Sequence, residues 1–265
     1  MIFKEIDGLG FATGRWPLDP EHPTLVFIHG SGGDHSLWEG QIDALAASAN
    51  TLALDLPGHG ASRGPGRTSV PEYAAVVAGL LNNIQPPRPI PCGLSLGGAI
   101  VLQLLLDWPS LPAAGVLMGT GARLRVRPEI LQTIDTDYAG FVDMLVRFSA
   151  SEKTDPQLLA PVQQSTAACS PDVTAGDFKA CDGFDVMGRL TEIDKPVLVM
   201  SGADDRLTPL KYSRYLEDHI RGSRRVQLQN AGHLVPIEQP SAVNEALQVF
   251  VAGMSKTHKH PPRIG

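Results

Sequence analysis

A serine lies at the centre of Gly93-Leu94-Ser95-Leu96-Gly97, between one apolar run that ends at Leu94 and another from Ile100 to Leu106. The pattern predicts a buried strand, a sharp turn and a helix, with Ser95 at the apex. A turn this tight needs residues without bulky Cβ atoms on both sides of the serine, and Gly93 and Gly97 meet that need. We therefore expect an exposed Ser95 hydroxyl that can act as an acyl-transfer nucleophile.

A serine hydroxyl needs a base to accept its proton, and the base needs an acceptor that holds its tautomer. Asp205 and His233 each stand in a loop after a predicted strand. The chain order Ser, Asp, His is the one that accompanies a strand-turn-helix serine. We expect the three side chains to meet at one edge of a sheet. Asp204 competes for the role of the acid because it adjoins Asp205.

Apolar runs and helical patterns alternate along most of the chain, which predicts an α/β fold. The expected strands follow a hairpin in the first 16 residues and cover residues 24–29, 51–54, 90–94, 113–118, 196–200 and 225–228. The expected helices cover residues 38–47, 70–84, 96–106, 209–219 and 241–252. This alternation indicates a mostly parallel central sheet of about eight strands, covered by helices on both faces.

Residues 122–190 interrupt the alternation, because they show helical periodicity without a convincing strand. We expect a helical cap there, inserted at the carboxyl side of the sheet, where it would cover Ser95 and line an acyl pocket. Residues 1–121 and 191–254 would then form the core. Residues 255–265 have almost nothing apolar to bury, which predicts a disordered tail.

Composition excludes several classes of function. The 265 residues contain 22 basic and 28 acidic side chains, so the net charge of −6 argues against nucleic-acid and anionic-membrane surfaces. No apolar run is long enough to span a bilayer. Cys92, Cys169 and Cys181 have neither disulfide nor zinc spacing. We expect a soluble cytoplasmic protein without a metal, and the oligomeric state stays open.

Three histidines and one aspartate stand in loop motifs near the expected site. His29 and His59 are expected to brace turns through hydrogen bonds, and His35 to lie at the pocket rim. Asp55 follows a predicted strand, and we interpret it as a structural turn residue.

Five motifs, in this order, make the chain resemble the α/β-hydrolase family. They are His29-Gly30-Ser31-Gly32-Gly33 with Trp38 downstream, Asp55-Leu56-Pro57-Gly58-His59-Gly60-Ala61-Ser62, Gly93-Leu94-Ser95-Leu96-Gly97-Gly98, Gly202-Ala203-Asp204-Asp205 and Gly232-His233. The resemblance implies nucleophile Ser95, acid Asp205 and base His233. It also implies oxyanion donors at the backbone N–H groups of Ser31 and Leu96. Family spacing favours Asp205 over its neighbour as the acid.

The implied activity is that of a serine hydrolase. It would cleave a carboxylic ester, lactone or related acyl bond of a small, largely apolar substrate through a Ser95 acyl-enzyme, with no cofactor. Two alternatives stay open: a small-molecule receptor with slow or no turnover, and a carbon–carbon bond hydrolase or lyase that uses the same triad. Fold alone does not choose between them.

Overall fold

An eight-stranded sheet in the order β1-β2-β4-β3-β5-β6-β7-β8 forms the centre of the molecule. The computed structural model describes residues 1–257, with side chains up to residue 254. The strands are β1 (Ile2–Ile6), β2 (Leu9–Thr13), β3 (Thr24–Ile28), β4 (Asn50–Leu54), β5 (Pro89–Leu94), β6 (Gly115–Met118), β7 (Val197–Gly202) and β8 (Arg224–Leu228). β1 and β2 form an antiparallel hairpin at one edge, and β3 to β8 run parallel. The predicted fold class is confirmed.

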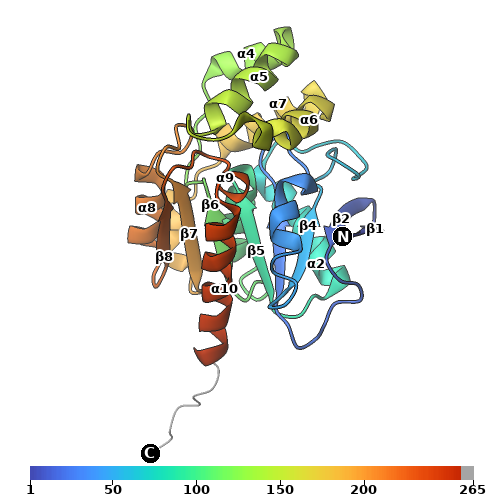
Figure 1. The fold of residues 1–265 in the computed structure, drawn as a ribbon, viewed down its shortest axis with the longest axis vertical. Helices are drawn as coiled ribbons and strands as arrows, with labels where there is room; N and C mark the ends of the chain where they lie inside the picture. The colour runs from blue at the N-terminus through green and yellow to red at the C-terminus, as the bar shows by residue number, and fades with distance from the viewer. Residues whose placement is uncertain (258–265) are drawn as a thin grey trace, which may run out of the picture.

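Helices cover both faces of the sheet, because central parallel strands such as β3, β6 and β7 are apolar on both sides. In β3, Val26 and Ile28 pack on one face, while Leu25 and Phe27 pack on the other. Figure 1 shows the long helix α10 along one of these faces. The helices around the sheet are α1 (Glu39–Ile42), α2 (Val70–Ile84), α3 (Leu96–Asp107), α8 (Lys211–His219), α9 (Val235–Glu238) and α10 (Pro240–Thr257).

Two expected segments differ from the structure. The helix expected over residues 38–47 is instead a 3-10 turn, η1 (His35–Trp38), followed by the short α1. After α1 the chain forms a tight turn, in which the N–H and the hydroxyl of Ser48 both donate to the Leu45 carbonyl, at 3.0 and 3.2 Å. At the other end, α10 continues to Thr257, past the expected start of the tail at residue 255. The rest of that tail, residues 258–265, lies outside the described residues.

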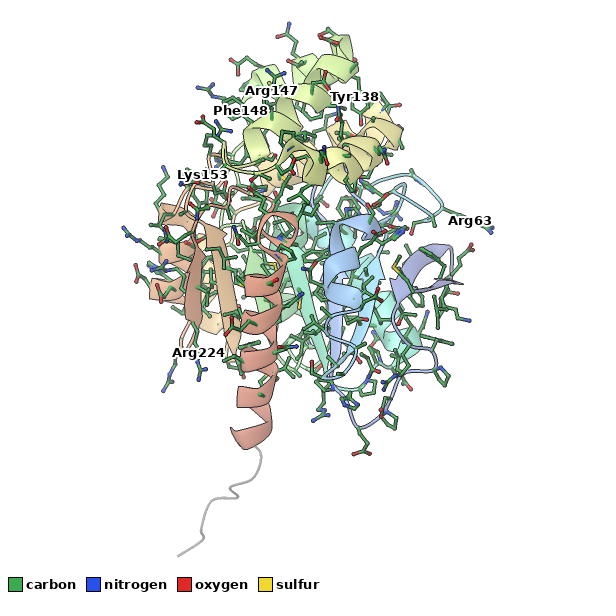
Figure 2. All side chains as sticks on the ribbon, viewed as in Figure 1. Arg63, Tyr138, Arg147, Phe148, Lys153 and Arg224 are labelled. Carbon is green, nitrogen blue, oxygen red and sulfur yellow. The ribbon has the colours of Figure 1, made fainter. Side chains whose placement is uncertain are left out.

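A group of helices between β6 and β7 lies above the carboxyl ends of the strands (Figure 1). We call them the cap helices: α4 (Pro128–Thr136), α5 (Tyr138–Ser149), α6 (Ala160–Ala168) and α7 (Pro171–Gly183), with the 3-10 turns η2 (Pro156–Leu159) and η3 (Met187–Glu192). They contain an apolar cluster of their own, formed by Ile134, Phe141, Val142 and Val146. Figure 2 shows Tyr138 and Phe148 among these helices, and Lys153 where they meet the sheet.

Neighbouring parallel strands end at matching positions in the sheet, and the loops that follow them lie beneath the cap helices. Ile28 at the end of β3 lies opposite Gly93 near the end of β5, and Gly202 at the end of β7 lies opposite Leu228 at the end of β8. Since parallel strands all end at the same edge, the loops that follow them open on one side of the sheet. The residues predicted to do chemistry stand in these loops.

Candidate active site

Ser95 stands at the sharp turn between β5 and α3. Its φ of 56° and ψ of −115° lie in a region that residues other than glycine rarely adopt, at a cost of about 1–3 kcal/mol. Neighbouring residues hold this conformation. The Ser95 N–H donates to the Met118 carbonyl at 2.9 Å, and the Ser95 carbonyl accepts from the Thr120 hydroxyl at 2.9 Å. The end of β6 and the loop after it therefore fix the serine backbone.

The two glycines beside the serine are required by close packing, as the sequence predicts. A Cβ on Gly93 would lie 2.1 Å from the Gly97 carbonyl, and a Cβ on Gly97 would lie 2.2 Å from the Ile28 oxygen. No side chain fits at such distances. Glycine is thus needed at both positions to let β5, α3 and β3 approach one another.

Asp205 and His233 form a buried hydrogen-bonded pair. The Asp205 Oδ2 atom lies 2.9 Å from His233 Nδ1. Burial alone would raise the pKa of Asp205, but the charge and hydrogen bond of His233 and two bonds from Thr208 outweigh burial and lower that pKa. A carboxylate only accepts hydrogen bonds, so Nδ1 of His233 donates, and in the neutral ring Nε2 is then the acceptor. This is the arrangement a general base needs.

His233 and Ser95 line the same cavity. Gly119, with φ of 48°, lets the histidine pass close over the end of β6, because a Cβ there would lie 3.0 Å from His233 Nδ1. The Ser95 hydroxyl forms no hydrogen bond with another described residue. Such contacts commonly tighten only when substrate binds. The three predicted residues lie in loops at one edge of the sheet, and the contact between the Ser95 hydroxyl and His233 stays a prediction.

Asp204 is engaged elsewhere. Its Oδ2 atom accepts a hydrogen bond from the Ser151 hydroxyl at 2.6 Å, at the base of the cap helices. The carboxylate paired with the histidine is therefore that of Asp205, which is the choice that the family spacing favours.

The two expected oxyanion donors belong to segments next to the serine: Leu96 follows Ser95 in the chain, and Ser31 lines the same cavity. Leu96 is the first residue of α3, where a helix leaves its N–H groups unpaired and its dipole favours negative charge. The loop of Ser31 approaches the serine closely, because a Cβ on Gly30 would lie 3.3 Å from the Ser95 Cβ. Neither N–H donates to another residue of the described chain. Both can therefore donate to an oxyanion.

Of the histidines outside the pair, His29 braces the loop of Ser31, as predicted. Its Nε2 accepts from the Leu56 N–H at 3.0 Å, so its Nδ1 donates to the Gly30 carbonyl at 2.8 Å. Burial and the nearby His59 lower the pKa of His29 to about 4, which keeps the ring neutral. His35 does not line the cavity. It pairs with Asp55 at 2.9 Å, so its expected place at the pocket rim is wrong.

The cavity above Ser95 has a volume of about 470 Å³. Phe148 lines the cavity, and half of its surface is exposed. The guanidinium carbon of Arg206 lies over its ring, 4.8 Å from the ring centre. The apolar part of the lining comes mostly from the cap helices and the segment that precedes them: Leu124, Val126, Ile130, Met144, Leu145, Phe148, Val162 and Phe178. The lining also contains three charged side chains that the sequence analysis did not single out: Arg125, Arg127 and Arg206. No carboxylate is among the described lining residues.

Two buried carboxylates that the sequence analysis missed hold the loops of the site. Glu238 accepts from the N–H groups of Gly232 and Leu234, which flank His233, each at 2.9 Å. Asp177 on α7 accepts from the Gly32 N–H at 2.9 Å. In the sequence these acids look like ordinary polar residues of surface helices. Only their burial singles them out, and the sequence pattern does not indicate it.

Within the described residues, no three His, Cys, Asp or Glu side chains gather where they could hold a metal ion. Over the same part of the chain, every helix is too short or too polar to cross a membrane.

The sheet order and the serine turn define a doubly covered α/β hydrolase architecture. The chain belongs to the alpha/beta hydrolase family, whose family model matches residues 25–246. It is 26% identical to a pimeloyl-[acyl-carrier protein] methyl ester esterase of Nitrosomonas europaea, over 80% of this chain and 88% of that protein. It is 27% identical to 3-oxoadipate enol-lactonase 2 of Acinetobacter baylyi, over 87% of this chain and 89% of that protein.

Solved structures agree with this assignment. A thermophilic esterase is 32% identical to the chain and superposes with a TM-score of 0.81, over 96% of this chain and 97% of its own. The predicted family is therefore confirmed, and these relatives are named for ester or lactone hydrolysis, the activity expected for this chain.

Proposed function

We propose that the chain is a serine hydrolase that cleaves a carboxylic ester or lactone through an acyl-enzyme on Ser95. The observation that supports this most directly is the buried Asp205–His233 pair, whose histidine lines the same cavity as Ser95. The family membership and the esterase and lactonase relatives support the same reaction class.

The proposed reaction has two steps. In the first, the Ser95 oxygen attacks the acyl carbon, His233 Nε2 takes the hydroxyl proton, and the carbonyl oxygen becomes an oxyanion that accepts from the Ser31 and Leu96 N–H groups. His233 then gives the proton to the leaving alcohol. In the second step, His233 removes a proton from water, whose oxygen attacks the acyl carbon. The bond from that carbon to the Ser95 oxygen then breaks, the acid leaves, and His233 returns the proton to the Ser95 oxygen. Asp205 stabilises the imidazolium that forms in both steps.

We further propose that residues 122–190 act as a cap domain over a core of residues 1–121 and 191–254. The separate apolar cluster of the cap helices supports this division. A cap in this place would exclude water and shape the acyl pocket. The three free cysteines support the cytoplasm as the location.

The lining of the cavity supports a small substrate whose acyl part is largely apolar. Arg125 and Arg127 form no ion pair with a described carboxylate. A substrate with a carboxylate far from the scissile bond would therefore find unpaired positive charge at the cavity. We expect the preferred substrates to combine an apolar acyl chain with such a group.

The test combines active-site variants with a panel of esters. The panel contains neutral alkyl esters and monoesters of dicarboxylic acids, each in increasing chain length. Ser95→Ala should abolish hydrolysis, and Asp205→Asn should lower kcat on the order of 10⁴-fold. Asp204→Asn is the matched control and should keep kcat near that of the wild type.

A fluorophosphonate probe gives the second arm, since it should label wild type and not Ser95→Ala. A protein that binds ligand but neither reacts with the probe nor turns over any ester would indicate the receptor alternative. Equal loss of activity in Asp204→Asn and Asp205→Asn would contradict the assignment of the acid.

A further inference from the structure

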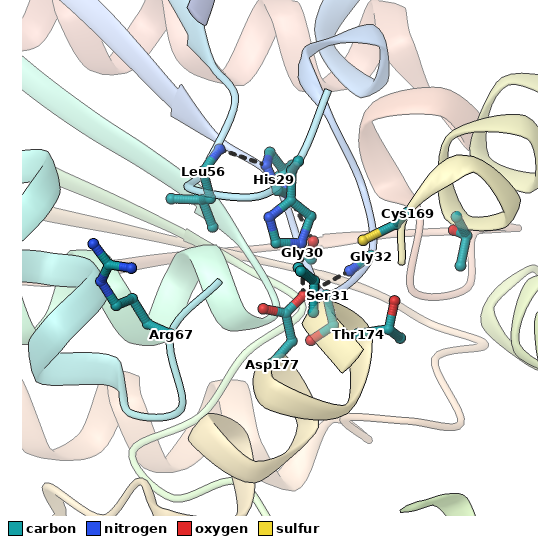
Figure 3. A network of polar contacts seen from close by, with 12 residues as sticks. His29, Gly30, Ser31, Gly32, Leu56, Arg67, Cys169, Thr174 and Asp177 are labelled. Carbon is teal, nitrogen blue, oxygen red and sulfur yellow. Dashed lines mark hydrogen bonds and ion pairs between the residues drawn. The ribbon is translucent and has the colours of Figure 1, made fainter. Parts of the chain in front are cut away.

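A buried carboxylate of the cap helices contacts the loop that contains Ser31. Asp177 lies on α7 and is fully buried. Its Oδ2 atom accepts from the Gly32 N–H and from His59 Nε2, both at 2.9 Å, and its Oδ1 atom accepts from the Tyr73 hydroxyl at 2.5 Å. Figure 3 shows Asp177 directed from its helix toward Ser31 and Gly32. All three donors lie outside the cap helices, so one side chain joins α7 to three parts of the core.

His59 supplies the positive charge that a buried carboxylate needs. Its Nε2 faces Asp177 and its Nδ1 faces the Pro57 carbonyl at 3.1 Å, so both ring nitrogens meet acceptors. An imidazole donates from both nitrogens only when it is protonated. Burial alone would lower the pKa of His59, but the charge and hydrogen bond of Asp177 outweigh it and raise that pKa to about 10. The two side chains therefore form a buried ion pair.

The Gly32 N–H has no other acceptor among the described residues. Gly32 has φ of 67°, and the Gly33 N–H donates back to the Gly30 carbonyl at 3.1 Å, so the loop turns tightly around it. A bond to the Gly32 N–H fixes the plane of the Ser31–Gly32 peptide. Fixing that plane restricts the backbone of Ser31, which lines the same cavity as Ser95 and whose own N–H donates to no described residue.

We propose that Asp177 is a positioning residue that holds this loop so that the Ser31 N–H stays directed at the oxyanion. The inference rests on the proposed function, since that function gives the Ser31 N–H its role. Asp177 does not line the cavity, so it acts through the loop and not on the substrate. Because Asp177 belongs to α7, a displacement of the cap helices would also release the loop.

The test compares Asp177→Ala and Asp177→Asn with Asp172→Asn, an exposed aspartate on the same helix. Removing an oxyanion donor lowers kcat by about 10²–10³-fold. Asp177→Ala leaves the Ser31 N–H in place but holds it less firmly, so kcat should fall by about 10- to 100-fold, with KM nearly unchanged. Asparagine keeps one acceptor oxygen for Gly32 and should recover part of this loss. Asp172→Asn should match the wild type. Each kcat is expressed per active site, and the number of active sites is measured by titration with a fluorophosphonate.

Two inhibitors separate positioning from a merely structural role. A trifluoromethyl ketone adds the Ser95 hydroxyl and forms a tetrahedral oxyanion, whereas the matching methyl ketone binds without that addition. The affinity for the trifluoromethyl ketone should fall in Asp177→Ala by about the factor lost in kcat/KM. The affinity for the methyl ketone should stay constant.

Equal losses for both ketones, or a kcat per titrated site within twofold of the wild type, would overturn the inference. If Asp177→Ala does not fold, Asp177→Asn and Tyr73→Phe provide the test, and an unchanged kcat in both would overturn it as well. A wild type that hydrolyses no ester would contradict the proposed function instead, so the two failures are distinguishable.

Discussion

The backbone of Ser95 depends on glycines whose neighbours leave no room for a side chain. At Gly97 the closest atom to an added Cβ is the backbone oxygen of Ile28, at 2.2 Å, and a backbone atom cannot rotate away. At Gly79, on the exposed side of α2, nothing lies within 4 Å of an added Cβ. The two positions therefore respond to the same substitution in opposite directions.

We expect Gly97→Ala to lower the free energy of unfolding by about 3 kcal/mol or more, because the added methyl group forces β3 and α3 apart. Gly79→Ala should raise it by about 0.5–1 kcal/mol, because alanine loses less backbone freedom in a helix. Urea unfolding followed by circular dichroism measures both values. Similar stability for the two variants would contradict the close packing at the serine turn.

At the level of elements, the short helix α9 holds the loop of His233. Glu238 at its end accepts from the N–H groups of Gly232 and Leu234, and its Oε2 atom also accepts from the Ser151 N–H at 2.8 Å and from the Thr154 hydroxyl at 2.5 Å. The segment after α5 and the loop after β8 are therefore joined through one carboxylate. The His233 N–H adds a bond to the Ser149 carbonyl at 2.6 Å.

We expect Glu238→Gln to lower the free energy of unfolding by about 1–3 kcal/mol, because the NH2 group of the amide would replace one of the two acceptor oxygens and face a buried donor. kcat should fall with it, since the His233 loop loses part of its support. Thermal unfolding and ester hydrolysis measure the two effects. Glu245→Gln, at an exposed position of α10, is the control and should change neither.

At the scale of the whole molecule, the cap helices and the core are joined by buried charge as well as by apolar contact. The His59–Asp177 pair lies between α7 and the loop after β4, with both side chains fully buried. The pKa of His59 rises from its ordinary value of 6.5 to about 10, where burial lowers it and Asp177 raises it more strongly. The attachment of the cap helices is therefore sensitive to pH.

We expect the free energy of unfolding to decline as the pH rises from about 6.5 to about 10. Below this range His59 is protonated in both the folded and the unfolded chain, so the stabilisation is complete. Within this pH range only the folded chain keeps the proton on His59, and above the range neither the folded nor the unfolded chain keeps it. Urea unfolding at several pH values should show a steeper decline for the wild type than for His59→Gln. Parallel curves for the two proteins would contradict the ion pair.

Local patterns in the sequence were enough to predict the alternating strands and helices, the glycine-flanked serine and the chain order of Ser95, Asp205 and His233. Each of these features depends on neighbours in the chain, or on the rule that parallel strands end at one edge. The division into cap and core, and the catalytic role of each residue, stay predictions.

Only the tertiary structure decided which of two adjacent aspartates pairs with His233, where His35 lies, and that Asp177 and Glu238 are buried where the cap helices meet the core. The partners of these side chains stand far away in the chain, 145 residues in the case of Gly32 and Asp177. A carboxylate in a helix has the same local pattern whether it faces water or a buried amide. Which of the two it meets depends on how the cap helices pack on the sheet, and packing is a property of the folded chain.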